Sequence, residues 1–246
     1  MRIVSLASGS KGNAFIVEHD GSAVLVDCGV PYGALAACEF DAVLLTHSHI
    51  DHVCGLKSLL RRRDVPVYAN LMTAESVAHA YGTPESAFVC FENGQPFDVG
   101  AFSVSAFSIP HDTSDPVGFL VSAGGETYFH GTDIGTPLDS IGVKLAGADV
   151  ATLESNHDPV MLRTSGRPPS LIQRIAGPRG HLSNDQACDL VRRFASPRLR
   201  RLALAHLSRD CNSPHLAEGA MRETLRGMGR EDVVLKTLSQ DEAVEI

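Results

Sequence analysis

The stretch Thr46–Gly55, THSHIDHVCG, constrains this chain more than any other, because it places three histidines and an aspartate within six positions directly after the apolar run DAVLL. That run predicts a buried strand. A polar side chain left unpaired in a protein interior costs about 2–7 kcal/mol, and a divalent cation removes that cost. Alternate residues at a strand end point the same way, so His47 and His49 can share one cation while Asp51 and His52 turn towards another. Imidazole and carboxylate suit zinc, manganese or iron.

Three later apolar stretches end in the same kind of side chain. VSAFSIPHD closes in His111, TYFHGTD closes in Asp133, and LRRLALAHLS reaches His206. A lone histidine near a strand end is usually a satisfied core or surface group. Four strands that all end in a metal-binding type of residue instead predict that these side chains converge on one edge of a sheet.

In this order the residues resemble the metallo-β-lactamase superfamily. Its five motifs can be followed along the chain as Asp27 in VLVDCG, then His47, His49, Asp51 and His52, then His111, Asp133 and His206. The resemblance implies two divalent metal ions (zinc, manganese or iron), bridged by Asp133 and a hydroxide. One ion would be held by His47, His49 and His111, and the other by Asp51, His52 and His206. Asp27 would accept a hydrogen bond from a ligand histidine and so fix its tautomer.

Further segments resemble the YycJ (WalJ) group of that superfamily, which is associated with nuclease activity on DNA. They are SLASGSKGN, HDTSDPVGF, LESNHDPVML, QRIAGPRGHLSN and LAHLSRDCN. The resemblance implies an α/β fold, a four-layer αββα metallo-β-lactamase sandwich formed by residues 1–246 as a single domain. Two places depart from the group's pattern, since Arg167 and Pro168 replace an aromatic-proline pair and Cys211 replaces an asparagine. Neither is an expected ligand, so the differences bear on substrate contacts.

Composition agrees with a globular domain. With 246 residues, of which 43% are hydrophobic, the chain can bury a full core without disulfides. Its six cysteines include no C-x-x-C pair, which indicates reduced thiols. The apolar run before Ser8 is too short for a signal peptide, and nothing approaches the roughly 20 apolar residues of a membrane span. We therefore expect a cytoplasmic protein with no membrane contact.

Hydrophobic periodicity and turn residues predict the regular elements. Strands are expected at Arg2–Ala7, Ala14–Glu18, Ala23–Asp27, Ala42–Thr46, Val67–Ala69, Phe102–Ile109, Val117–Ser122, Thr127–His130, Asp149–Glu154 and Arg201–His206. Helices are expected at His49–Arg63, Thr73–His79, Leu138–Leu145, Ser183–Phe194 and Ser213–Arg226. Short strands in both halves, with helices after each set, are compatible with two sheets between helices.

Two further residues are candidates for catalysis together with Asp51. Glu154 ends the apolar strand ADVATLE, and His181 precedes a helix start. They resemble a Glu–His dyad that lies beside the metals in the ribonuclease Z enzymes of the superfamily. The alternative is that Glu154 caps a helix and His181 binds a loop carbonyl. His157 and Asp158 are equally compatible with substrate or metal-shell contacts and with loop architecture.

The opening loop SGSKGN allows two interpretations. Glycines let backbone N–H groups approach an anion and Lys11 adds charge, so the loop, with Ser8 at its start, can hold a phosphate. A tight turn between two strands has the same composition. Asn13 is expected to satisfy backbone groups or metal ligands rather than substrate.

The charge distribution is uneven. The chain carries a net charge of −8, which opposes whole-protein attraction to nucleic acid. The span Met161–Arg201, however, has nine arginines against two acids, a surplus of seven positive charges that brackets His181. A basic strip beside the metals would capture a phosphate backbone locally. The alternative is a set of solvated helix faces. The arginines are Arg163, Arg167, Arg174, Arg179, Arg192, Arg193, Arg198, Arg200 and Arg201.

These observations predict a metal-dependent phosphodiesterase or nuclease with a dinuclear site. The leading hypothesis is a DNA exonuclease that works 5′ to 3′ through a metal-bridging hydroxide, with nucleic acid as its partner. The alternative is a small-molecule hydrolase of the same fold that acts on a cyclic phosphate, lactone or thioester. His49 argues against the di-iron reductases of the superfamily, which carry Glu there. Asp133 argues against a secreted β-lactamase, which has a zinc-binding cysteine at that position.

Overall fold

Contacts within the chain group it into two units in the computed structural model, which describes residues 1–246. The first unit comprises Met1–Ser108, Thr113–Gly125 and Ser239–Ile246, and the second comprises Ile109–Asp112 and Glu126–Leu238. The assignment of residues 1–246 to a single domain stays a prediction. No helix in either unit is both long and apolar enough to cross a membrane.

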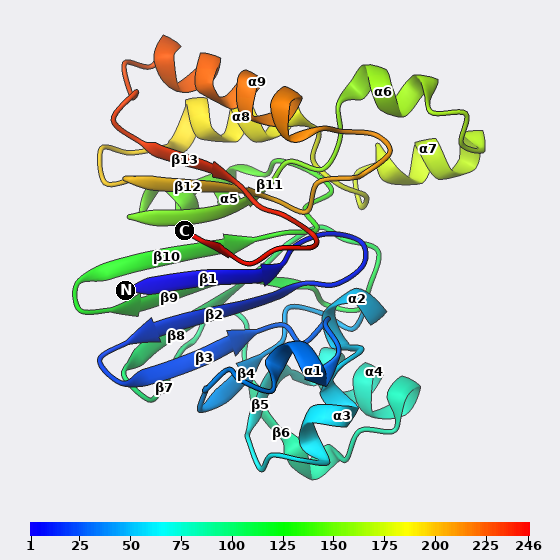
Figure 1. Cartoon of the computed structure of the whole chain (residues 1–246), viewed down its shortest axis with the longest axis vertical. Helices are drawn as coiled ribbons and strands as arrows, with labels where there is room; N and C mark the ends of the chain where they lie inside the picture. The colour runs from blue at the N-terminus through cyan, green and yellow to red at the C-terminus, as the bar shows by residue number, and fades with distance from the viewer. The chain divides into compact units, whose positions relative to one another are not determined.

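A seven-stranded mixed sheet dominates the first unit, with strand order β14-β1-β2-β3-β4-β5-β6 (Figure 1). Strands β1, β2 and β3 form an antiparallel meander, and β3 to β6 run parallel to one another. The parallel strands have their carboxyl ends at one edge, which is where the histidine-rich stretch begins. The bounds are β1 Arg2–Ala7, β2 Ala14–His19, β3 Ser22–Val26, β4 Ala42–Leu44, β5 Val67–Asn70, β6 Phe88–Phe91 and β14 Val244–Glu245.

Three more strands of this unit pair antiparallel in the order β9-β8-β7. They are β7 Pro96–Val99, β8 Phe102–Ser108 and β9 Val117–Ala123. In β8, Phe102, Val104 and Ala106 are buried while Ser103 is exposed, the alternation of a strand with one face in a core. The helices of the unit are α1 Tyr32–Leu35, α2 Ile50–Val53, α3 Leu56–Leu60, α4 Leu71–Tyr81 and the 3-10 turn η1 Glu85–Ala87.

The helix predicted over His49–Arg63 is wrong as a continuous element, because α2 and α3 separate at Cys54 and Gly55. The Gly55 N–H donates to Cys28 O at 2.9 Å, so the backbone after β3 passes directly against the break. A Cβ at Gly55 would lie 2.0 Å from Val30 O. This close approach, which periodicity does not reveal, fixes α2 against the end of β3.

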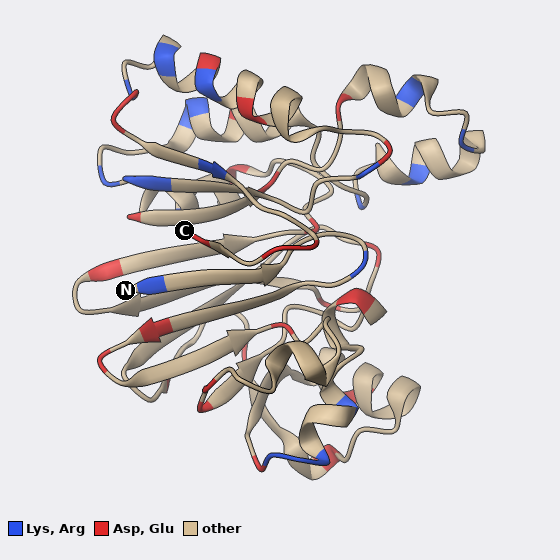
Figure 2. Ribbon diagram, in the orientation of Figure 1, with Lys and Arg blue, Asp and Glu red and all other residues tan.

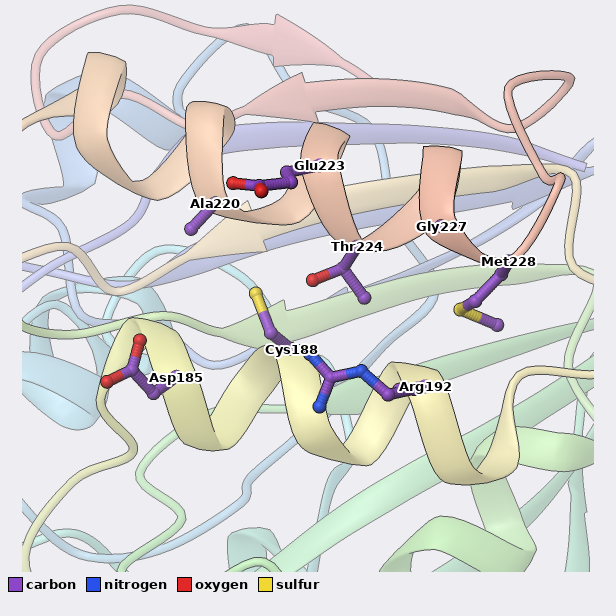
Figure 3. Close-up of a pocket in the computed structure, with 8 residues that line it drawn as sticks. All are labelled: Asp185, Cys188, Arg192, Ala220, Glu223, Thr224, Gly227 and Met228. Carbon is purple, nitrogen blue, oxygen red and sulfur yellow. The ribbon is translucent and has the colours of Figure 1, made fainter.

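The second unit contains four parallel strands in the order β13-β12-β11-β10. Helices follow the strands in the chain, and α8 and α9 lie side by side along one another (Figures 1 and 3). Leu153, Leu202 and Leu204 on the strands and Leu190 and Val191 on α8 are buried in its core. The bounds are β10 Glu126–Gly131, β11 Val150–Glu154, β12 Arg201–Ala205, β13 Val234–Thr237, α5 Asp139–Ala146, α6 Pro159–Thr164, α7 Pro169–Ile175, α8 Asn184–Phe194 and α9 Pro214–Gly227.

Most of the elements expected from periodicity are present. Each expected strand occurs, and so do the other four expected helices, with ends shifted by no more than about two residues. The elements that the sequence did not indicate are β6, β7, β13, β14, α1, η1, α6 and α7.

The contact at Gly55 generates a prediction for stability. Gly55→Ala should lower the free energy of unfolding by about 1–3 kcal/mol, because the new methyl group would collide with backbone that cannot move aside. Gly33→Ala is the matched control, since Gly33 lies in α1 with no atom within 4 Å of an added Cβ. It should raise stability by about 0.4–1 kcal/mol. Urea unfolding of both variants measures the difference, and equal stabilities would contradict the packing described.

Candidate metal site

Three histidines of the first unit lie together, His47 and His49 on the loop between β4 and α2 and His52 within α2. The ring centroids of His47 and His52 are 4.0 Å apart, and those of His47 and His49 are 4.8 Å apart. His47 and His52 are wholly buried, and Asp51 Oδ2 lies 3.7 Å from His52 Nε2. The loop turns into α2 at Ile50, which brings Asp51 and His52 back towards His47. The structure thus brings together the four predicted ligands of this stretch.

Asp27 accepts a hydrogen bond from a predicted ligand histidine, as the sequence led us to expect. It follows β3, and His52 Nδ1 donates to its Oδ2 at 2.7 Å. Its Oδ1 accepts the Thr46 N–H at 2.9 Å, and the Thr46 hydroxyl adds a third donor. The φ of Asp27 is 60°, the left-handed region that few non-glycine residues occupy. Because Nδ1 of His52 is engaged by a buried carboxylate, Nε2 is left as its acceptor atom.

Asn13 binds backbone and ligand residues rather than solvent. It is wholly buried, its Oδ1 accepts the Gly9 N–H at 2.9 Å, and its Nδ2 lies 3.1 Å from His52 Nε2. Ser8 is also buried, and its N–H donates to Ser239 O at 3.0 Å. Lys11 is exposed at the tip of this loop. The loop is thus a turn closed by Asn13, and phosphate binding by Lys11 stays a prediction.

A second cluster lies within the second unit. One ligand atom from each of Asp133, Glu154, His181 and His206 lies within 4.8 Å of the others. Asp133 follows β10, Glu154 ends β11 and His206 follows β12, so three neighbouring parallel strands deliver their last residues to one edge. Asp133 and His206 have φ values of 59° and 56°, which turns the chain sharply at the strand ends.

Glu154 is the centre of this cluster. Its Oε1 accepts hydrogen bonds from His181 Nδ1 at 2.8 Å and His206 Nδ1 at 3.0 Å. Its Oε2 accepts the N–H groups of Ile134 at 2.7 Å and Leu182 at 3.0 Å. Burial alone would raise the pKa of the Glu154 carboxyl, but the charge and hydrogen bond of His181 and the hydrogen bond of His206 lower it to about 2.

This arrangement decides what Glu154 can do. The carboxylate is 0% exposed and both of its oxygens are occupied by donors, so it orients the two imidazoles and does not reach a substrate. The predicted contact between Glu154 and His181 is present, in place of the alternative in which His181 binds a loop carbonyl. Burial would lower the pKa of His181, yet Glu154 raises it above its usual value.

His111 completes the cluster from the loop after β8. Its Nδ1 donates to Gly180 O at 3.1 Å, which leaves Nε2 as the acceptor atom. That Nε2 lies 3.7 Å from Asp133 Oδ1, and the rings of His111 and His181 are 5.2 Å apart. The carbonyl next to His181 therefore orients the His111 ring.

Buried asparagines that the sequence reasoning missed hold the loops of this cluster together. Asn184 Nδ2 donates to Asn212 Oδ1 at 3.0 Å, and the Ser155 hydroxyl donates to Asn184 Oδ1 at 2.7 Å. Asn156 Nδ2 donates to His206 O at 2.8 Å. The motifs LESN, HLSN and RDCN each end in one of these residues, so the signal was their shared final asparagine.

His157 and Asp158 have different environments. Asp158 is the N-cap of α6, where its Oδ1 accepts the N–H groups of Val160 and Met161. This assigns it to helix architecture. His157 is 3% exposed, its Nδ1 has no hydrogen-bond partner, and its backbone pairs with Ser183. Burial lowers the pKa of its imidazole.

The basic strip expected over Met161–Arg201 does not form, because helix and strand geometry spreads its arginines. Arg192 and Arg193 lie at the end of α8 away from His181, and Arg201 begins β12, the end opposite to His206. Most of the nine also pair with carboxylates, as Arg193 does with Asp189 at 3.3 Å. Four of the nine lie on or beside α6 and α7, and two of these, Arg174 and Arg179, contact Asp112 and the His111 carbonyl. The four are Arg163, Arg167, Arg174 and Arg179.

A groove of about 450 Å³ between α8 and α9 contains none of the clustered residues (Figure 3). Its walls combine acids with Arg192, Cys188 and Met228, and nothing in it resembles a metal-ligand set. It is lined by Asp185, Cys188, Arg192, Ala220, Glu223, Thr224, Gly227 and Met228.

The donor sets fit a metal. Each cluster offers imidazole nitrogens and carboxylate oxygens without thiolate, the set preferred by zinc, manganese and iron. In each cluster a buried carboxylate holds the Nδ1 of a predicted ligand histidine, Asp27 for His52 and Glu154 for His206. Histidine ligands of metals usually donate their other N–H to such a partner. The His/Asp clusters therefore fit a metal site.

Comparison with known proteins identifies the class. Residues 23–207 match the family model described as beta-lactamase superfamily domain. The chain therefore belongs to the β-lactamase superfamily. Its fold agrees, because zinc-bound PqqB from Methylobacterium extorquens superimposes with a TM-score of 0.73 at 18% identity, over 100% of this chain and 99% of that one. The predicted α/β metallo-β-lactamase fold, with mixed sheets and flanking helices, is confirmed.

The resemblance to the YycJ/WalJ group is also confirmed. The chain is 32% identical over 234 residues to exodeoxyribonuclease YycJ of Bacillus anthracis, covering 91% of this chain and 89% of the relative. It is 30% identical over 228 residues to exodeoxyribonuclease WalJ of Streptococcus pneumoniae, covering 88% and 85%. These relatives support a hydrolase that acts on phosphodiester bonds.

The hydrogen bond between Asp27 and His52 generates a prediction for metal binding. Asp27→Asn keeps the side-chain size and tolerates a left-handed φ, but it removes the charge that orients His52. Zinc affinity, measured by competition with a chromophoric chelator, should fall about 10–100-fold. Asp41→Asn is the control, because Asp41 also accepts a backbone N–H, that of Ala23, but on the exposed surface. Unchanged affinity in Asp27→Asn would refute the orienting role.

Proposed function

We propose that this protein is a metal-dependent DNA exonuclease that removes nucleotides in the 5′ to 3′ direction in the cytoplasm. The main support for the proposal is the cluster of Asp133, Glu154, His181 and His206. The chain that contains this cluster is similar, over most of its length, to proteins named exodeoxyribonucleases. A nuclease needs groups that stabilise negative charge on phosphate and a group that protonates the departing oxygen. The clusters offer both types of residue.

The metal ligands are assigned by the superfamily motifs. One divalent ion is assigned to His47, His49 and His111, and a second to Asp51, His52 and His206, with Asp133 shared. Zinc, manganese and iron all suit these donors. When bound, such ions lower the pKa of water and offset charge on a phosphoryl group.

His181 is proposed as the general acid for the leaving oxygen. Glu154 holds its Nδ1 at 2.8 Å, so the ring is fixed and Nε2 is free to face a substrate. The side chain is 21% exposed, whereas Glu154 is fully buried, so of the two only His181 can touch the reacting atoms. A positioned histidine of this kind contributes about 10²–10⁴-fold to a rate.

A small-molecule hydrolase is the second candidate, and charge favours it. The chain has a net charge of −8, and most arginines of Met161–Arg201 pair with carboxylates, for example Arg198 with Asp149 at 2.7 Å. This leaves a small basic surface for a polyanion. A cyclic phosphate, lactone or thioester would need no such surface.

The deciding experiment compares substrates on the metal-loaded protein. Single- and double-stranded DNA and RNA of one sequence, labelled at the 5′ or the 3′ end, are incubated beside a panel of cyclic phosphates, lactones and thioesters. We expect DNA to be shortened from its 5′ end, so that a 5′ label is released as a mononucleotide or short fragment at the earliest times. Efficient turnover of a small ester with intact DNA would establish the second candidate instead.

The role of His181 is tested separately. His181→Ala should keep its bound metal and its fold while losing about 10²–10⁴-fold in rate on DNA, whose leaving oxygen needs a proton. On bis-p-nitrophenyl phosphate, which has a good leaving group, the loss should be much smaller. Single-turnover rates on both substrates, together with metal content, give the comparison.

His215→Ala is the control for this variant, because His215 is an exposed histidine on α9. It should match the parent on both substrates. An equal loss on both substrates in His181→Ala would assign His181 to positioning rather than to proton transfer.

A further inference from the structure

The two short helices α6 and α7 form a hairpin that departs from the Glu154 cluster and returns to it. The chain leaves through Asp158, the N-cap of α6, and comes back through Gly180 to His181. Figure 1 shows α6 and α7 beyond the ends of α8 and α9, away from the strands of their unit. Both ends of the hairpin are therefore held at the edge where Glu154 and His181 lie.

The hairpin exposes apolar side chains. No residue of α7 is fully buried, and its apolar residues Leu171, Ile172 and Ile175 are only half-buried. On α6, Val160 is 56% exposed. A helix of a globular protein normally buries its apolar stripe fully against a core, and a stripe that is only partly covered beside a functional site indicates a contact surface.

The hairpin also carries only positive charge. Residues Pro159–Gly180 contain four arginines and no acid, in a chain with a net charge of −8 (Figure 2). Arg163 on α6 is exposed and makes no hydrogen bond or ion pair. Its charge is therefore available to an anionic ligand.

The other three arginines tie the hairpin to the loops that carry predicted ligands. Arg174 pairs with Asp112, next to His111, at 2.6 Å, and Arg179 Nε donates to His111 O at 2.9 Å. Arg167 pairs with Asp210, on the loop after His206, at 2.8 Å. These contacts hold the hairpin in one place, so little ordering is needed when a ligand binds.

From these observations we infer that the α6–α7 hairpin binds the DNA strand next to the end that is cut. Arg163 contacts a backbone phosphate, and Val160 with the half-buried apolar residues of α7 contacts sugars and base faces. A surface that combines a free guanidinium with apolar groups matches a polynucleotide, which alternates phosphates with apolar ring faces. The inference rests on the proposed function, because it names the surface that would guide DNA to the same site.

The test uses the metal-loaded full chain and a fluorescent oligodeoxynucleotide with phosphorothioate linkages, which slow cleavage. Arg163→Glu should weaken binding about fivefold or more and reduce the magnitude of the slope of log K against log salt by roughly 0.7 on single strands or 0.9 on duplex. Arg163→Lys, which keeps the charge, should restore most of both. Bis-p-nitrophenyl phosphate hydrolysis should be unchanged, because this small ester has no neighbouring strand to hold and needs only the bound metals.

Arg192→Glu is the matched control. It makes the same change in net charge on an exposed helix position at the far end of α8, so any loss it shows measures general repulsion. If Arg163→Glu and Arg192→Glu bind DNA equally well and with the same salt slope, the hairpin is not the surface that binds the DNA strand. That result, with the parent still shortening DNA, would overturn this inference alone, whereas a parent that leaves DNA intact would overturn the proposed function.

Discussion

The buried carboxylate of Glu154 is the interaction on which the second unit's functional edge depends. It accepts two imidazole and two backbone N–H groups, and each donor comes from a loop that must return to the same point after a strand or before a helix. A carboxylate in an apolar interior is stable only when it is paired in this way. In satisfying Glu154, the fold also fixes the rings of His181 and His206.

In the first unit, too, a buried carboxylate orients a histidine, although with fewer donors. Asp27 is buried at the end of β3 and holds His52 and Thr46, while Asn13 closes the opening loop over His52. Asp27, Asp133 and His206 all adopt positive φ. Such backbone is strained by roughly 1–2 kcal/mol per residue and persists where surrounding contacts over-determine it. At these three positions the strain coincides with the residues that the motifs mark.

Charge in this protein is organised by pairing rather than by patches. The acidic chain neutralises most arginines of its basic span with nearby carboxylates, such as Asp149 for Arg198. Paired surface arginines add little long-range attraction, because the field of each pair is short-ranged and screened by salt. The hairpin of α6 and α7 differs because it has no acid of its own, and its paired arginines use acids of the ligand-bearing loops. Binding of a polyanion would then be a local property of this edge.

The sequence by itself determined the ten expected strands and the residue types at their ends, but not β6, β7, β13 or β14. Apolar alternation and the clustering of His47, His49, Asp51 and His52 are local patterns. The sequence did not determine the break at Gly55, which arises because the backbone of Cys28 and Val30 passes too close for a side chain. It also missed α6 and α7, since the Asp158–Pro159 start was present but no buried apolar stripe followed it. The dispersal of the arginines, and the meeting of His181 and His206 on one oxygen of Glu154, were decided by tertiary structure alone. The physical reason is that side chains far apart in sequence share a hydrogen-bond acceptor only after the sheet has aligned the strand ends that carry them.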